Sequence, residues 1–446
     1  MTVTSTYKVK ILQHNHIFDE TVGIYRKAVA FFLNVCGKEW AVLESLKSKE
    51  RNNHLERLTH RTAKNPAPKY DFDSKFYKMP PYLRRAATQE AIGAYSSYVS
   101  NHENWIKGGR KGKEPRLTFD RNTMPVLYKG NMFKWVDRCT AKVKIYHRND
   151  WVWLEASLRE QDIRYIEKHC SQDKMQSPKF KKQGKRWHLS FPFERTVTFE
   201  DVPVEERTIC AVDLGLNQNA VCSIMRSNGT VVARKFINFP TEKDHLYKAL
   251  GRQKKAQQHG NRKTPVLWKH VNDINTEISR KIAKAIMEFA LLHQADVIVF
   301  EHLESVGKLR GSKKQRLALW RKKEIQRIVE HNAHKNGIRI SRVCAWGTSK
   351  LAFDGSGCVT RGSYVQNGES KHNYSICVFP NGKTYHCDLN ASYNIGARYF
   401  IRELLKSESV MIRLPAGAND LHYGTGTTRT LSTLIRLYAD LSAVCA

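Results

Sequence analysis

The spacing of apolar positions predicts both helices and strands in the N-terminal half of the chain. Apolar residues alternate at 7–12, which predicts a strand, and recur at helical spacing over 18–36, which predicts a helix. A second helix is expected after the prolines at 80 and 81, because proline is favoured in the first helical turn. From 116 to 200 the apolar segments are short, β-branched and aromatic, as in the strands of a small β-barrel or sandwich.

The C-terminal half alternates between strands and helices. Three consecutive strands are predicted from 207 to about 239, and Ser227-Asn228-Gly229 is a strong signal for a hairpin turn between the last two. Beyond them the pattern predicts, in order, a helix with isoleucine at nearly every fourth position, a buried strand, a third helix, another strand, a loop-rich insert at 347–387 and a last helix from about Asn390. Three antiparallel strands followed by alternating helices and strands is the RNase H-like order.

The net charge of the chain gives the first indication of its function. The 446 residues carry a formal net charge of +33, and a hydrophobic content of 41% is enough for real cores. Such an excess of positive charge favours a nucleic-acid partner, because phosphate contacts neutralise it and release counterions. No apolar run reaches the roughly 20 residues of a membrane span, and the start lacks the apolar stretch of a secretory signal. The ten cysteines show no disulfide rhythm, so a reducing interior is expected.

Three acids lie where predicted elements end. Asp213 ends the first apolar strand of the C-terminal half, Glu301 ends the buried strand VIVFE, and Asp388 lies just before the last helix. Strands 1 and 4 of an RNase H-like sheet are parallel neighbours, so these acids should converge. Each acid alone has an ordinary explanation: a turn residue for Asp213, a solvated strand end for Glu301 and a helix N-cap for Asp388.

Together the three carboxylates predict a metal-dependent nuclease centre. Hard divalent ions prefer oxygen ligands, and two of them can activate a water and stabilise the leaving oxygen of a phosphodiester. We therefore predict that Asp213, Glu301 and Asp388 are both the catalytic and the metal-ligating residues. The predicted cofactor is two Mg²⁺ ions, with Mn²⁺ as the alternative.

Sequence motifs add a family resemblance. AVDLGLNQNAVCSI, VIVFEHLESV and CDLNASYNIGARYF resemble the three RuvC-like motifs of the TnpB family, which is related to type V CRISPR effectors. WGTSK, at 346–350, resembles the stretch that opens the family's zinc-knuckle insert. The resemblance is firm over about 207–402 and looser in the N-terminal half.

The resemblance implies an RNA-guided, transposon-encoded DNA endonuclease. It implies a guide RNA from the transposon end and a double-stranded DNA target with a short adjacent motif, in a prokaryotic, nucleoid-associated, cytoplasmic setting without a membrane partner. It also implies a multidomain α+β architecture. Its predicted domains are an oligonucleotide-binding, wedge-like β-barrel (1–17 and 116–205), an inserted helical recognition lobe (18–115), a RuvC-like nuclease domain (206–346 and 386–411), a target-binding insert (347–385) and a C-terminal tail without an assigned role (412–446).

The insert departs from the family pattern. The family usually has two Cys-x-x-Cys pairs there, whereas Cys344, Cys358, Cys377 and Cys387 are widely and irregularly spaced. Structural zinc is therefore not expected. Two turn-rich hairpins, at 354–357 and at Asn381-Gly382, suggest instead that strand pairing keeps the insert in shape.

Two basic runs are candidate nucleic-acid contacts. We predict phosphate contacts for nine residues: Lys313, Lys314, Arg316, Arg321, Lys322, Lys323, Lys181, Lys182 and Arg186. A solvated helix face or a bare loop is the ordinary alternative for such runs. Two other functions also stay open at this stage: a guide-dependent DNA-binding repressor that does not cut, and an RNase H-like nuclease or transposase without a guide RNA.

Overall fold

The computed structural model describes residues 1–13, 16–117, 123–215, 218–261, 263–303, 321–366, 369–407 and 423–443; for 363–371 it describes the backbone alone. The chain divides into two compact units. One comprises Thr2–Thr196 and the other comprises Met1 with Val197–Ala446, so each is described by itself. Within the described ranges, no helix combines the length and apolar character that a membrane crossing requires.

The strands of the first unit form two open antiparallel sheets. In the larger sheet β7 pairs with β1 on one side and with β5 and β6 on the other; the smaller has the order β2-β3-β4. The strands are β1 (Thr2–Lys10), β2 (Phe133–Trp135), β3 (Thr140–His147), β4 (Asp150–Ser157), β5 (Lys174–Met175), β6 (Lys179–Gln183) and β7 (Arg186–Thr196).

The predicted wedge-like β-barrel is not closed in the described part of this unit. The two sheets are joined at their edges by an isolated bridge between Ile11, next to β1, and Leu158, next to β4. Other details also differ from the sequence prediction. The basic run at 179–186, for which a bare loop was one alternative, forms β6 and the start of β7, and the helix α4 (Glu160–Cys170) was not predicted. Both segments are rich in charged residues and have few buried positions, so their apolar residues show no clear helical or strand period.

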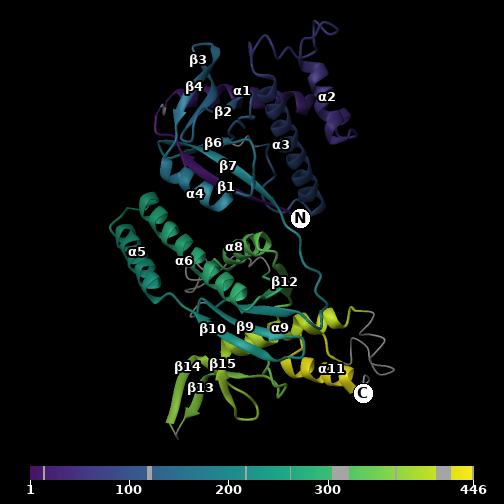
Figure 1. Ribbon diagram of the computed structural model, residues 1–446, viewed down its shortest axis with the longest axis vertical. Coiled ribbons are helices and arrows are strands. Elements are labelled where there is room, and N and C mark those ends of the chain that lie inside the picture. Colours follow the sequence, from purple (N-terminus) through teal and green to yellow (C-terminus); the bar gives the residue numbers. More distant parts are fainter. Residues whose placement is uncertain are drawn as a thin grey trace. The chain divides into compact units, whose positions relative to one another are not determined.

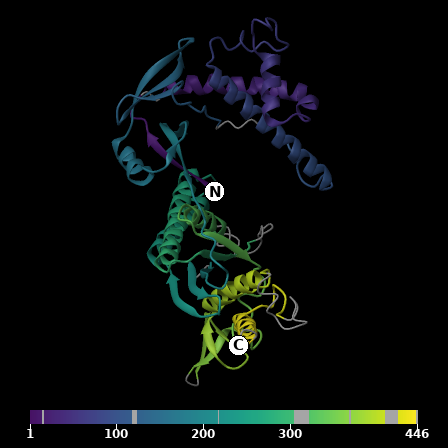
Figure 2. The same cartoon turned by 45° about the vertical axis from the view of Figure 1, so that its right-hand side comes forward.

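In the described part of the chain, three more helices of the first unit lie between β1 and β2 in the sequence. They are α1 (Ile17–Leu43), α2 (Ser48–Thr59) and α3 (Pro81–Lys107). α1 and α3 pack along each other and share one hydrophobic core with the sheets (Figure 2). Pro81 occupies the first turn of α3, as the sequence predicted.

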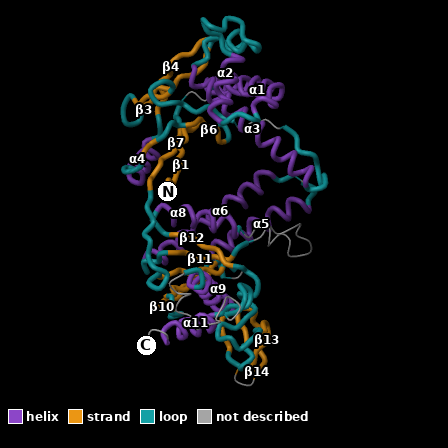
Figure 3. The backbone as a smooth tube through the Cα atoms, turned by 90° about the vertical axis from the view of Figure 1, so that its right-hand side faces the viewer, coloured by secondary structure: helices purple, strands orange, loops and turns teal. Residues whose placement is uncertain are grey.

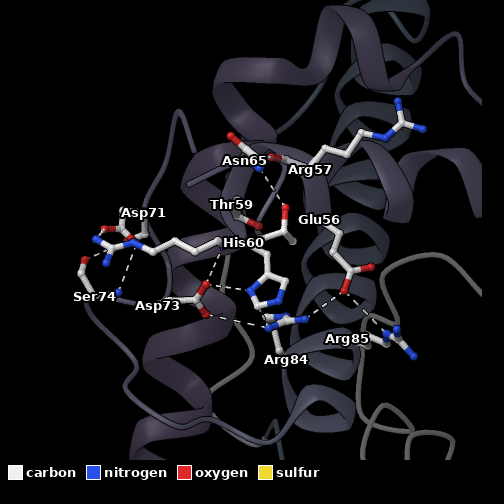
Figure 4. Close-up of polar contacts among 12 residues, drawn as sticks. Glu56, Arg57, Thr59, His60, Asn65, Asp71, Asp73, Ser74, Arg84 and Arg85 are labelled. Atoms are coloured by element: carbon white, nitrogen blue, oxygen red, sulfur yellow. Dashed lines mark hydrogen bonds and ion pairs between the residues drawn. The ribbon is translucent and has the colours of Figure 1, made fainter. Parts of the chain in front are cut away.

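A buried arginine fastens α2 to α3. The guanidinium of Arg84, a residue only 6% exposed, donates to Glu56 at 2.9 Å and lies 2.9 Å from Nδ1 of His60. The same nitrogen of His60 lies 2.7 Å from Asp73 (Figure 4). Since a buried charge is tolerated only when its donors are satisfied, this network makes the α2–α3 contact specific rather than merely apolar.

The second unit is built on a five-stranded sheet of order β10-β9-β8-β11-β12. β9 is antiparallel to β8 and β10, whereas β11 is parallel to both β8 and β12. This is the RNase H-like arrangement that the sequence predicted. The strands are β8 (Thr208–Asp213), β9 (Ala220–Arg226), β10 (Val231–Ile237), β11 (Val297–Glu301) and β12 (Arg339–Val343).

Helices cover both faces of this sheet (Figure 1). α9 (Cys387–Leu404) packs against one face and carries α11 (Leu431–Ala443) on its outer side, whereas α6 (Pro265–Leu292) and α8 (Lys322–Lys335) cover the other. α5 (Pro240–Gln258) packs on α6 and was not predicted. Alternate residues of β8 therefore point into different cores, with Ala211 towards α9 and Val212 towards α6.

The insert between β12 and α9 forms a sheet of its own (Figure 3). Its strands, in the order β13-β14-β15, are β13 (Thr360–Gln366), β14 (Glu369–Val378) and β15 (Thr384–His386). Gly382, with φ +82°, makes the β14–β15 turn, which confirms the predicted Asn381-Gly382 hairpin. A small core of Ala352, Cys377, Phe379 and Cys387 closes the insert against the start of α9.

Candidate active site

Asp213 is held at the end of a buried central strand. It is the last residue of β8, it pairs with Val221 of β9, and it is 8% exposed. The alternation along β8 places its side chain on the face of Ala211, which is the face that α9 covers. A carboxylate can occupy this position because it lies at the end of the strand, at the edge of the apolar core.

Glu301 ends the neighbouring parallel strand at the same level. Phe300 of β11 pairs with Val212 of β8, so Glu301 lies beside Asp213 across a strand spacing of about 4.8 Å. The hydroxyl of Thr348 donates to the Glu301 carboxylate. The side chain of Gln326 donates to its backbone oxygen at 3.0 Å, which ties this strand end to α8.

Asp388 reaches the same point from α9. The helix begins at Cys387 with His386 as its N-cap, so Asp388 lies in the first turn rather than before the helix. The predicted start near Asn390 is therefore three residues late, and the N-cap explanation for Asp388 is excluded. A Cβ placed on Gly215 would lie 3.4 Å from Oδ2 of Asp388 and 2.7 Å from the backbone oxygen of Gln218. Glycine thus lets the chain after β8 pass beside the carboxylate of Asp388.

The three carboxylates influence one another electrostatically. Burial raises the pKa of Asp213 well above its usual value, and the charges of Glu301 and Asp388 raise it further, while Arg361 opposes the shift. Burial also raises the pKa of Glu301 and of Asp388. The hydrogen bond from Thr348 limits the shift at Glu301. Asp213 is thus buried beside two half-buried acids whose charges repel its own.

The three carboxylates suit a hard cation, although their side chains are not arranged as a complete set of metal ligands. Within the described ranges, no three His, Cys, Asp or Glu side chains are positioned as a group that could hold a metal ion. Oxygen donors that repel one another and are partly desolvated gain most from a dication, which removes the repulsion and replaces lost solvation. The residues Asp213, Glu301 and Asp388 therefore fit divalent ions of the Mg²⁺ class.

Two asparagines of α9 hold the loop that faces Glu301. Asn394 donates to the backbone oxygens of Thr348 and Leu351, both at 2.9 Å, and Asn390 donates to that of Leu351 at 2.8 Å. Asn390 and Asn394 are fully buried. Sequence reasoning used their motif, Asp-x-Asn-Ala-x-x-Asn-Ile, to recognise a family but missed its physical role. The signal was present, because two amides four residues apart share one helix face.

Arg398 adds a third anchor one turn further along α9. It is 3% exposed, and it donates to the backbone oxygens of Cys344 and Trp346 at 2.8 and 2.7 Å. It also donates to those of Thr427 and Arg429 at 2.8 and 3.1 Å. Its positive charge acts on Glu301 and opposes the rise that burial causes in the pKa of that acid. The same guanidinium therefore shapes the loop and compensates the acidic cluster.

The predicted nucleic-acid contacts have different surroundings. Lys313, Lys314 and Arg316 lie outside the described residues. Arg321 donates to Thr276 and Asn272 of α6 at 2.6 and 2.9 Å, which is a structural role. Lys322 and Lys323 begin α8, and the charge of Lys322 acts on Glu301.

The basic run of the first unit is exposed on β6 and β7. Lys181 and Arg186 are exposed, whereas Lys182 bonds to Asp19 at 2.6 Å and lies over the Trp187 ring. In the insert region Cys344 and Cys358 are exposed, while Cys377 and Cys387 are buried.

Comparison with known proteins identifies the chain. The profile of the Aq_aa04 family matches residues 5–147. The uncharacterized protein aq_aa04 of Aquifex aeolicus (strain VF5) is 30% identical over 144 residues, covering 28% of this chain and 81% of that protein. The TnpB-like protein aq_aa05 of the same organism is 26% identical over 242 residues, covering 49% of this chain and 76% of that protein. The chain belongs to the Aq_aa04 family in its N-terminal part, and over about half of its length it is similar to a TnpB-like protein.

A solved structure shares the fold. It is described as the mini-RNA-guided endonuclease CRISPR-Cas_phi3, and it superimposes with a TM-score of 0.52 at 10% identity. The match covers 88% of this chain and 92% of the other. At that identity the likeness concerns the fold alone, and it extends over both units.

Proposed function

We propose that the protein is an RNA-guided DNA endonuclease of TnpB type that hydrolyses phosphodiester bonds at a single RuvC-like site. The observation that carries this proposal is the convergence of Asp213, Glu301 and Asp388 at one end of the sheet, where the charges of Glu301 and Asp388 raise the pKa of Asp213. A cluster of repelling acids is costly for folding alone, and it persists where catalysis uses it.

The site chemistry follows from the donor set. Asp213, Glu301 and Asp388 would hold two Mg²⁺ or Mn²⁺ ions, which supply activation of water and charge neutralisation at the phosphate. The chain's own residues position these donors. Thr348 orients the Glu301 carboxylate, and Gly215 leaves room beside Asp388. Arg398, with its guanidinium buried beneath the loop, keeps Trp346 and its neighbours in place.

The partners follow from charge and from the relatives. A net charge of +33 suits a protein that carries RNA and DNA together. The shared fold with an RNA-guided endonuclease supports a guide RNA and a double-stranded DNA target with a short adjacent motif. We assign the first unit to guide and duplex recognition, with the helices α1–α3 as a recognition lobe, and the second unit to cleavage. The insert sheet β13–β15 would hold the target strand.

The test combines RNA sequencing with cleavage. The full chain is expressed with its flanking genomic DNA, the co-purified RNA is sequenced, and a plasmid matched to that RNA is incubated with Mg²⁺ or with EDTA. Asp213→Ala serves as the catalytic control, and Asp173→Ala, in the first unit, serves as a control acid outside the cluster.

The outcomes separate the alternatives. A defined RNA with cutting that needs both Mg²⁺ and Asp213 supports the proposal. A defined RNA without cutting by the wild type would replace it with a guide-dependent repressor, and cutting without RNA would replace it with a guide-independent nuclease.

A further inference from the structure

Trp346 is an exposed aromatic residue on a tightly fixed loop. It is 62% exposed, although tryptophan is a residue that proteins bury to a large extent on average. It follows β12 and precedes Thr348, whose hydroxyl bonds to Glu301. Two residues span at most about 7 Å, so the indole is attached beside the acidic cluster.

The loop around it is held at almost every backbone oxygen. Arg398 binds the oxygens of Cys344 and Trp346, and Asn394 binds that of Thr348. Arg361 donates to the oxygen of Ser349 at 2.6 Å. Such anchoring fixes the backbone from which the indole extends. The exposed ring is therefore presented at a defined place, where a partner can contact it.

Glycine at position 347 is required for this geometry. Its φ of +74° belongs to the left-handed region, and a Cβ there would lie 3.1 Å from the backbone oxygen of Thr427. The chain therefore turns sharply directly after Trp346, towards Thr348 and the carboxylates.

The surroundings of the indole are cationic. The ammonium group of Lys350 lies 6.0 Å from the centre of the Trp346 ring, and both Lys350 and Arg361 are exposed. An aromatic plane flanked by cations is the arrangement that binds single-stranded nucleic acid, with a base on the ring and phosphates on the cations. A duplex would keep its bases stacked inside, so the fitting partner is an unpaired nucleotide.

We infer that Trp346 stacks on a base of the single strand that is cut, and that Lys350 contacts an adjacent phosphate. This stacking would fix the strand beside Asp213, Glu301 and Asp388. The inference rests on the proposed nuclease function, and it adds a named positioning contact for the strand. It also gives the WGTSK motif a physical purpose: an aromatic platform, a turn and a hydroxyl for the Glu301 carboxylate.

The experiment uses the full chain with its co-purified RNA. A matched single strand carrying 5-iododeoxyuridine is added to the Asp213→Ala protein, irradiated, and the crosslinked peptide is identified by mass spectrometry. In parallel, cleavage rates are measured for Trp346→Ala, Trp346→Phe and Tyr247→Ala. Tyr247 is the control because it is also exposed, at 79%, but lies on α5.

We expect a crosslink at Trp346 and cleavage about ten-fold slower in Trp346→Ala, since base stacking on an aromatic side chain contributes that much or more. Trp346→Phe should recover most of the rate, Tyr247→Ala should cut like the wild type, and thermal unfolding of Trp346→Ala should be unchanged. Recovery by another aromatic ring would not follow from a merely structural role.

Two results would overturn the inference: an unchanged cleavage rate in Trp346→Ala, or crosslinks that never include Trp346 in a protein that cuts. Failure of the proposed function looks different. A wild-type protein that cuts no DNA, yet crosslinks at Trp346, would refute the nuclease and retain the stacking contact.

Discussion

Replacing Asp213 by asparagine should abolish cleavage and at the same time stabilise the metal-free protein. Asp213 is 8% exposed, and burial together with the charges of Glu301 and Asp388 raises its pKa. Asparagine keeps the shape and removes the charge. Relieving such a functional strain typically adds about 0.5–2 kcal/mol to the free energy of unfolding. For a unit of this size each kcal/mol raises the Tm by about 2–4 °C.

The pH dependence of this gain has a defined sign. Below the ordinary aspartate pKa of 3.8 the acid is protonated in both states and Asp213→Asn gains nothing. As the pH rises, the unfolded chain loses its proton first, so the wild type is progressively destabilised until the pH passes the raised pKa of the folded state. The advantage of the variant should therefore grow from pH 4 upwards and then level off.

Differential scanning calorimetry with EDTA or Mg²⁺ measures both effects. In EDTA the variant should unfold a few degrees above the wild type, in the transition of the second unit. At a Mg²⁺ concentration of 100 times the dissociation constant, the wild type should gain about 2.7 kcal/mol and the variant much less. A variant that is less stable than the wild type in EDTA at pH 8 would refute the reasoning that these acids repel one another.

Two further predictions concern residues around the acids. Thr348→Val removes the hydrogen bond to Glu301 without changing the side-chain shape, so the cleavage rate should fall by about ten-fold, equivalent to a charge-assisted bond of roughly 1.5 kcal/mol. Thr348→Ser keeps the hydroxyl and should restore the rate. Equal rates for the valine and serine variants would contradict this role. Gly215→Ala should reduce cleavage strongly, because its Cβ would meet the rigid backbone oxygen of Gln218 at 2.7 Å, whereas Gly251→Ala, on α5, should be tolerated, because a Cβ there would meet nothing within 4 Å. Plasmid cleavage and calorimetry measure both pairs, and equal losses in the two alanine variants would show that the contact at 215 is not decisive.

The sequence was sufficient to predict an element wherever its buried residues recur at the spacing of a helix or a strand. The β8 strand TICAVD and the α6 helix with Ile278, Ile282 and Ile286 have apolar positions at the spacing of their structures, and both form as predicted. Because parallel neighbours end at the same sheet edge, the convergence of Asp213 and Glu301 followed from the order of elements alone. What failed was recognition of charged segments, such as α4 and β6, whose few buried residues give a weak period.

The remainder of the site depends on contacts between segments distant in sequence. No local pattern indicates that Thr348 bonds to Glu301 or that the Arg398 guanidinium binds four backbone oxygens. The start of α9 was placed too late, since Cys387 and Asp388 resemble the end of a strand more than the first turn of a helix. The barrel was predicted because short aromatic strands fit barrels and sandwiches equally well, and pairing between sheets leaves no local mark.

The hydrogen bonds of Arg398 link early and late parts of the second unit, which determines the order in which these parts can fold during synthesis. Four of the backbone oxygens that fix the 344–346 loop and the 427–429 segment meet on one side chain of α9. Asn394 is also bonded to the backbone nitrogen of Leu431, at 3.3 Å. A nascent chain folds domain by domain from its N-terminus as it is made, so the first unit can fold before the second is complete. The Trp346 loop shares the Arg398 guanidinium with residues 427 and 429, so its full set of bonds can form only after these late residues have been made.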